Sequence, residues 1–271
     1  MNETMKRPRG RPRKHASETD NSPVQALDRG LNLLKLLATE RGASLSDLAM
    51  QAGVPASTAH RLLTTLQGHR CAEFDETNQH WMIGVEAYRI GSGFLNRINL
   101  VEAAQPIMQA LVRETGETAN LAIVDEGEVV FVRQIESPNP IRAFFRPGTR
   151  SQMHASGAGK ALLAQRPQAE VEDILQKRGL QRFTDKTITK PADLFSELER
   201  IHQRGWSFDD EERYVGMSCV AAPVFGPTEQ PIAAISVSGP STRFSEQSVA
   251  DFSVIVRNSA KELTRSLGGK T

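Results

Sequence analysis

The stretch "SLSDLAMQAGVPASTAHRLLTTLQGHR", residues 44–70, contains two short helical patterns separated by a glycine-containing turn. The first opens with a serine three residues before an aspartate, the spacing of a capping box, and ends at Gly53 after two turns. The second restarts at Pro55, a residue suited to the first turn of a helix. Its apolar face consists of Leu62, Leu63 and Leu66. Two short helices around such a turn predict a helix-turn-helix.

The flanking segments complete a small domain. Upstream, "VQALDRGLNLLKLLATE" predicts one amphipathic helix over residues 24–40, with Leu27, Leu31, Leu34 and Leu37 on its buried face. Downstream, "CAEFDETNQHWMIG" has two alternating runs about a polar turn, which predicts a β-hairpin wing over residues 71–84. Residues 23–84 are therefore expected to form a winged helix-turn-helix DNA-binding domain.

The second helix of a helix-turn-helix enters the major groove of double-stranded DNA. Small polar and basic residues lie outside its leucine stripe, and an arginine there can bind a guanine or a phosphate. The alternative is that Ser57 caps the helix and the others only solvate its surface, or that the domain binds protein. The candidate DNA-binding residues are Ser57, Thr58, His60, Arg61, Thr64 and Thr65.

The segment "KRPRGRPRK", residues 6–14, adds a second feature suited to DNA. Its prolines exclude a helix, so the segment runs extended, with Arg9 and Arg11 on either side of a glycine. An extended, positively charged segment of this kind suits the A·T minor groove, and "RGRP" resembles the core of an AT-hook. Residues 1–22 are thus expected to be a disordered basic arm; the alternative is a tail that improves solubility or binds any polyanion.

Length, charge and cysteine content limit the function classes. A chain of 271 residues is long enough for two domains. Residues 1–70 carry a net charge of +5 and the remaining residues a net charge of −4. The N-terminal part of the chain is therefore the candidate for binding a polyanion. Two distant cysteines and the lack of a signal peptide predict a cytoplasmic protein, and no apolar run is long enough to span a membrane. The histidines and cysteines lack metal-ligand spacing, so we expect no metal site and no cofactor.

The rest of the chain predicts a linker helix over residues 85–98 and an α+β domain over residues 99–271, built around an antiparallel sheet. Helical patterns at 85–97 and 99–116 are interrupted near Gly91 and Gly93 and restricted by Pro106. Expected strands are a hairpin at 118–135, "IRAFF" at 141–145 and a pair at 219–239. Expected helices are 157–165, 168–178, 191–204 and 245–267.

Four features of this second domain could form a pocket. "HASGAGKA", residues 154–161, is a small-residue turn leading into a helix; it fails the phosphate-loop pattern at both ends, and tight packing is the alternative explanation. "SFDDEER" contributes Asp209, although an acidic run more often forms a solvated face. Cys219 is more often a core residue, whereas Ser236 and Ser238 lie on one face of a strand. Together they suit a small anion with a second polar group, and no catalytic triad is evident.

Across nearly its whole length the chain resembles the IclR family of transcriptional regulators. The motifs "ASTAHRLLTTL", "HWMIG", "MHASGAGKALLA", "SFDDEE" followed by "VGMSC", and "AAISVSGPSTR" are most similar to the glyoxylate-responsive branch. This resemblance implies a GAF-like effector domain, a homodimer or homotetramer, and a non-enzymatic regulator that binds promoter DNA. It also implies that glyoxylate contacts the backbone of Gly157 and Ala158, with Asp209 opposite, in a pocket completed by Met217, Cys219, Ser236 and Ser238.

One segment departs from that branch: "PNPIRAFFRPGTR", residues 138–150, has Pro140 and Ala143 where the relatives have Met and Leu. A changed wall could admit pyruvate, glycolate or another two- to three-carbon acid. The resemblance leaves open whether the protein represses or activates. The rival hypotheses are an enzyme that acts on a small keto acid and a constitutive DNA-architectural protein with a degenerate pocket.

Overall fold

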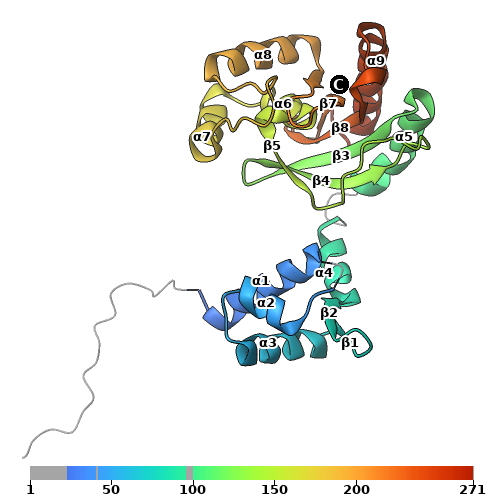
Figure 1. The fold of residues 1–271 in the computed structure, drawn as a ribbon. Coiled ribbons are helices and arrows are strands. Elements are labelled where there is room, and N and C mark those ends of the chain that lie inside the picture. The colour runs from blue at the N-terminus through green and yellow to red at the C-terminus, as the bar shows by residue number, and fades with distance from the viewer. Residues whose placement is uncertain (1–22, 41, 96–99, 271) are drawn as a thin grey trace, which may run out of the picture. The chain divides into compact units, whose positions relative to one another are not determined.

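The computed structural model describes residues 23–40, 42–95 and 100–270, and the chain divides into two compact units between Phe94 and Leu95 (Figure 1). The predicted basic arm, with Arg9 and Arg11, lies outside the described residues, as do residues 96–98 of the predicted linker helix.

The N-terminal unit has three helices, a hairpin and a fourth helix: α1 (Gln25–Thr39), α2 (Leu45–Gln51), α3 (Ala56–Gly68), β1 (Ala72–Asp75), β2 (His80–Ile83) and α4 (Val85–Leu95). The Ser44 hydroxyl caps α2 by accepting from the Asp47 amide at 3.2 Å. The hairpin closes over the helices because Trp81 is buried and its backbone pairs with Ala43. This is the winged helix-turn-helix that the sequence predicts.

The predicted buried face of α1 is confirmed at Leu37, which is fully buried, and wrong at Leu27 and Leu31, which are 61% and 48% exposed. Leu34 is half-buried, and Leu33 is fully buried although it was not on the predicted face. Gly30 is also buried, and a Cβ there would stand at an ordinary contact distance, 3.9 Å, from Leu62 of α3. The prediction of an interruption near Gly91 and Gly93 is also wrong, since α4 runs through both glycines.

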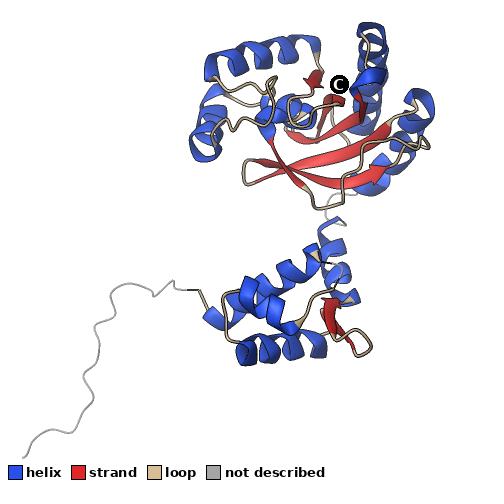
Figure 2. Ribbon diagram, viewed as in Figure 1, coloured by secondary structure: helices blue, strands red, loops and turns tan. Residues whose placement is uncertain are grey.

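The C-terminal unit is built on a six-stranded antiparallel sheet in the order β5-β4-β3-β8-β7-β6 (Figure 2). Its strands are β3 (Thr118–Asp125), β4 (Glu128–Ile135), β5 (Arg150–Gln152), β6 (Ser207–Asp210), β7 (Met217–Phe225) and β8 (Pro231–Pro240). The central strands alternate strictly between two faces, so that neighbours such as Ala234 and Ile235 enter different cores.

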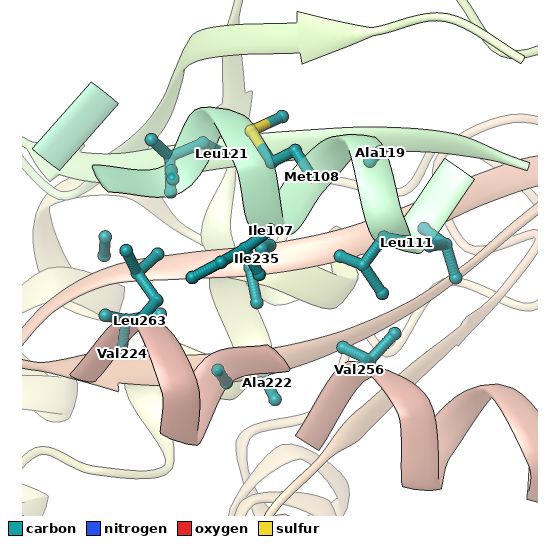
Figure 3. Packing of buried hydrophobic residues seen from close by; sticks show 14 of the residues in the cluster. Ile107, Met108, Leu111, Ala119, Leu121, Ala222, Val224, Ile235, Val256 and Leu263 are labelled. Carbon is teal, nitrogen blue, oxygen red and sulfur yellow. The ribbon is translucent and has the colours of Figure 1, made fainter. Parts of the chain in front are cut away.

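Helices cover both faces of the sheet. On one face, α5 (Leu100–Thr115) and α9 (Glu246–Ser266) contribute Ile107, Met108, Leu111, Val256 and Leu263 to a continuous apolar core (Figure 3). On the other face lie α6 (Gly157–Leu163), α7 (Gln168–Arg178) and α8 (Pro191–Arg204). Two short 3₁₀ turns, η1 (Met153–Ala155) and η2 (Ser241–Arg243), precede α6 and α9. The architecture is α+β, as the sequence predicts.

Two details of the second unit differ from the sequence-based expectations. "IRAFF" is not a strand: residues 141–145 are irregular, and the Ala143 carbonyl accepts a hydrogen bond from the Thr118 hydroxyl at 3.0 Å rather than from a neighbouring strand. Two edge strands, β5 and β6, were not predicted, because each is too short to show an alternating pattern.

The tight contact between α6 and η1 gives a test of this packing. A Cβ on Gly159 would stand 2.3 Å from the Met153 carbonyl oxygen, a backbone atom that cannot move aside. We expect Gly159→Ala to destabilise the C-terminal unit by about 2 kcal/mol or more, measured by thermal unfolding. In the control, Gly91→Ala, the added methyl meets open space within α4 and stability is expected to rise slightly. Equal Tm values for Gly159→Ala and the wild type would contradict the packing.

Candidate functional site

A small cavity of about 30 Å³ lies between the polar face of the sheet and the start of α6. A cavity of this size is limited to a few waters or one very small ligand. Five of the seven residues predicted to bind the effector line it: Gly157, Asp209, Met217, Cys219 and Ser238. The other two, Ala158 and Ser236, are buried close by in sequence but do not line the cavity.

The sheet contributes a polar floor to the cavity. Asn120 on β3 donates to the Ser238 hydroxyl at 3.2 Å, and Gln134 on β4 donates to the Asn120 side-chain oxygen at 2.8 Å. The hydroxyl of Ser236 is buried beside this chain, and the geometry gives it no conventional hydrogen bond. The sequence indicates the two serines but not the amides that orient Ser238, because Asn120 and Gln134 are brought close to them only by strand pairing.

Cys219 forms part of the wall as a neutral thiol. Burial is the main cause that raises its pKa, to about 12, and the nearby Asp209 carboxylate raises it further. A thiol with this pKa is not ionised at neutral pH and is a poor nucleophile. The sulfur also limits what can face it, since a Cβ on Gly157 would stand 2.9 Å from Sγ. Cys219 therefore shapes the cavity and offers no covalent chemistry.

Asp209, on the edge strand β6, brings a buried carboxyl group to the cavity. Its Oδ1 accepts from the Glu212 amide at 2.8 Å, and the Gly157 amide also faces the carboxylate. Burial raises the pKa of Asp209 to about 6, while the positive charge of Lys160 and these amides act in the opposite direction. The group is consequently ionised at neutral pH and can accept a hydrogen bond from a ligand.

Lys160 and Glu212 form a buried ion pair behind Asp209. Lys160 is 1% exposed, and its ammonium group donates to the Glu212 carboxylate and, at 2.6 Å, to the Phe208 carbonyl oxygen. Burial raises the pKa of Glu212 to about 7, against the lowering effect of Lys160. Lys160 thus links Phe208, which precedes Asp209 in the chain, to Glu212, which follows it. The sequence indicates Lys160 only as a candidate phosphate-loop residue. Its ion pair with Glu212 joins positions 52 residues apart and cannot be seen in the local pattern.

Aromatic side chains and one arginine close the outer side of the cavity. Phe131 and Phe145 stack with ring centroids 4.7 Å apart, and Tyr214 lies beside Phe145. Arg213 also lines the cavity, with its guanidinium over the ring of Phe183. The predicted wall residues Pro140 and Ala143 do not line it: Pro140 is exposed, and Ala143 is buried against Thr118. Phe145 occupies the wall instead.

In the N-terminal unit, α3 carries all six predicted DNA-binding residues. Ser57, His60, Arg61, Thr64 and Thr65 are exposed, and Thr58 is half-buried. Ser57 does not cap the helix, because the cap position is Pro55 and no side chain caps the helix start. His60 lies edge-on to Trp81 of the wing, whereas Thr58 and Thr65 border a groove against α1. Arg29 of α1 lines the same groove and was not predicted.

No described helix is both long and apolar enough to cross a lipid bilayer. Within the described ranges, no group of three or more potential ligand side chains has the arrangement of a metal site.

Comparison with known proteins assigns both units. Residues 26–76 match the IclR helix-turn-helix domain, and residues 92–265 match the bacterial transcriptional regulator IclR C-terminal domain. The chain belongs to the IclR family. It is 44% identical to the HTH-type transcriptional regulator BhcR of Paracoccus denitrificans over 95% of this chain and 94% of that protein. It is 40% identical to the transcriptional repressor IclR of Escherichia coli, over 96% of each chain.

Among solved structures, an IclR homologue from Microbacterium hydrocarbonoxydans, complexed with 4-hydroxybenzoate, has a TM-score of 0.79 at 25% identity, covering 89% of this chain and 98% of that one. As a member of the IclR family, the protein is a DNA-binding transcriptional regulator with a C-terminal effector-binding domain, and it is not an enzyme. The keto-acid enzyme hypothesis is therefore wrong.

The buried position of Asp209 gives a pH-dependent prediction. Its folded-state pKa is raised to about 6, so the folded state binds the proton more tightly than the unfolded chain does. The resulting stabilisation is complete below the unfolded-state pKa and is lost as the pH rises through 6. Asp209→Asn removes this dependence. As the pH rises from 4.5 to 7.5, we expect the free energy of unfolding of the variant to increase by about 1–2 kcal/mol relative to that of the wild type. Urea unfolding at each pH measures this difference.

Asp185→Asn is the matched control, because the Asp185 side chain is exposed, pairs with Arg182 at the surface and is not among the charges that act on Asp209. We expect the stability of this variant to follow that of the wild type across the same pH range. A difference between Asp209→Asn and the wild type that is constant with pH would show that the Asp209 carboxyl is not the titrating group.

Proposed function

We propose that the protein controls transcription of genes of two-carbon metabolism in response to glyoxylate, which binds in the 30 Å³ cavity of the C-terminal unit. The cavity's small size carries the proposal, because it limits the ligand to a molecule of a few atoms. Its lining agrees with a small polar acid: one buried carboxylate, the oriented hydroxyl of Ser238 and apolar walls. The 4-hydroxybenzoate bound by the Microbacterium homologue contains an aromatic ring, which needs a larger space.

In this proposal the effector lies between the start of α6 and β6, with the backbone of Gly157 and Ala158 on one side and Asp209 opposite. An ionised Asp209 accepts a hydrogen bond, so it favours a ligand with a hydroxyl donor, such as the hydrate of glyoxylate. Ser238 and Cys219 contact the remaining polar edge, with Ser236 two residues away on the same face of β8, and Met217 packs against the carbon atoms. Pyruvate and glycolate are the alternative effectors, and glycolate shares the hydroxyl donor.

Effector binding must favour one of two conformations in order to alter DNA binding. We place the DNA-contacting residues on α3 and on the arm at residues 1–22, in a homodimer or homotetramer that acts in the cytoplasm. The predicted linker, residues 85–98, connects the DNA-binding domain at 23–84 to the effector domain at 99–271. Whether the effector releases the protein from DNA or recruits it defines a repressor or an activator.

Calorimetric titration with glyoxylate, pyruvate, glycolate and oxalate tests the effector. We expect glyoxylate to bind more tightly than the other three acids and to change a DNA mobility shift on the protein's own promoter region at fixed salt. Asp209→Ala should abolish this response while DNA affinity without effector stays within about twofold, because Asp209 lies in the other unit. Asp209→Asn keeps the side-chain shape if the alanine variant does not fold. Absence of binding by all four acids would contradict the proposal and favour the constitutive architectural protein.

The DNA-binding residues are tested by salt dependence. Each lost phosphate contact reduces the slope of log K against log salt by about one. Arg9→Ala combined with Arg11→Ala should weaken DNA binding and flatten this slope by about two, and Arg61→Ala should weaken it further. Lys177→Ala, a change in the C-terminal unit on the exposed end of α7, is the control. An unchanged slope in the arm variant would exclude DNA contacts by the arm.

A further inference from the structure

Arg213 is a cavity-lining cation that the proposed function leaves without a role. It follows the acidic run on the turn after β6 and lines the cavity together with Asp209, Ser238 and Tyr214. Its side chain is half-buried, so its charge is partly removed from water. A guanidinium in such a position normally pairs with a carboxylate or a phosphate, because leaving it unpaired costs free energy.

The described part of the chain offers no such pair. No carboxylate of the described residues lies within 4.0 Å of the Arg213 guanidinium, and no described acceptor takes a hydrogen bond from it. Its two acidic neighbours are already engaged: Glu212 pairs with Lys160, and Glu211 lies near Lys186. Asp209 is influenced mainly by burial and by Lys160, and Arg213 is not among the charges that act on it. No carboxylate of the described residues therefore neutralises the positive charge of Arg213.

The contacts that Arg213 does make leave its donors free. The guanidinium carbon lies 3.7 Å from the centroid of the Phe183 ring and 5.5 Å from that of Tyr214. A cation–π contact with Phe183 takes no hydrogen bond from the guanidinium, so its five N–H groups have no acceptor among the described residues. His154 stacks against Phe183 from the same wall, which supports the ring that holds Arg213. The side chain is thus held in place with its hydrogen-bonding edge unused.

We propose that Arg213 binds the carboxylate of the effector through its free N–H edge, while Asp209 accepts a hydrogen bond from the effector's hydroxyl group. This inference rests on the proposed function and names the ligand class more closely. A cation and an anion at separate positions of one small cavity select a molecule with a carboxylate at one end and a hydroxyl donor at the other. Such molecules are 2-hydroxy acids and the hydrates of 2-oxo acids.

The same arrangement discriminates against close analogues. Oxalate offers a second carboxylate where Asp209 requires a donor, so two negative charges would meet in a buried site. Glycolamide keeps the hydroxyl group but replaces the carboxylate by a neutral amide, and so it loses only the interaction with Arg213. Glycolate and glycolamide form a matched pair of probes that differ at the one group which Arg213 is proposed to bind.

Calorimetric titration of the full-length protein with these two compounds tests the assignment. In Arg213→Met we expect the affinity for glycolate to fall about tenfold or more, the effect of losing a hydrogen-bonded ion pair, and the affinity for glycolamide to change less than about twofold. Arg182→Met is the control: it removes the same charge from an exposed side chain that pairs with Asp185, and both affinities should stay at wild-type values.

Arg213→Lys gives a second test, because it keeps the charge and the apolar stem but not the planar fork. Its affinity for glycolate should fall between those of the wild type and Arg213→Met. Equal losses for glycolate and glycolamide in both variants would mean that Arg213 only shapes the wall, and the assignment would be wrong. If the wild type binds glycolate and Arg213→Met binds it equally tightly, the assignment alone fails. If the wild type binds neither glycolate nor glyoxylate, the proposed function fails with it.

Discussion

The alternation of side chains along β3, β7 and β8 is the constraint on which the C-terminal unit depends. In β8, Ala233, Ile235 and Val237 enter the core beneath α5 and α9, while Ser236 and Ser238 point to the opposite face. A shift of register by one residue would bury the serines in that core and expose the apolar residues to the cavity. One strand therefore secures the fold with one set of side chains and supplies the site's hydroxyl groups with the other.

The charges behind the cavity follow from a second constraint, the cost of burying ions. Asp209 and Glu212 are two carboxyl groups in a region where water is excluded, and Lys160 is the single buried cation beside them in the described chain. Without that cation both groups would be protonated more readily, and Asp209 would become a hydrogen-bond donor. Lys160 acts on the protonation of Asp209, the group proposed to face the ligand, and so would influence ligand choice without touching the ligand.

The sequence predicts the positions of helices and strands better than it predicts which of their faces are buried. Helical periodicity, capping and turn residues are local, so the winged helix-turn-helix and most helices of the second unit could be placed from sequence. The buried face of α1 could not, since Leu27 and Leu33 are equally apolar and only packing in the folded unit buries Leu33 and leaves Leu27 exposed. Similarly, motif resemblance pointed to Asp209 and Ser238, whereas Arg213, Phe145 and the Lys160 ion pair depend on contacts between segments far apart in the chain.

The position of Asp209 on β6 has a mechanical consequence. This strand has only four residues, lies at the edge of the sheet and pairs with β7 alone. Its displacement breaks few backbone hydrogen bonds, whereas displacement of β7 or β8 would disrupt ladders on both sides. Asp209, proposed to face the ligand, thus belongs to an edge strand, whereas Ser238, two strands away in the same row, belongs to the centre of the sheet. In the proposed function, a small movement of this edge strand relative to the centre is the change that ligand binding would produce.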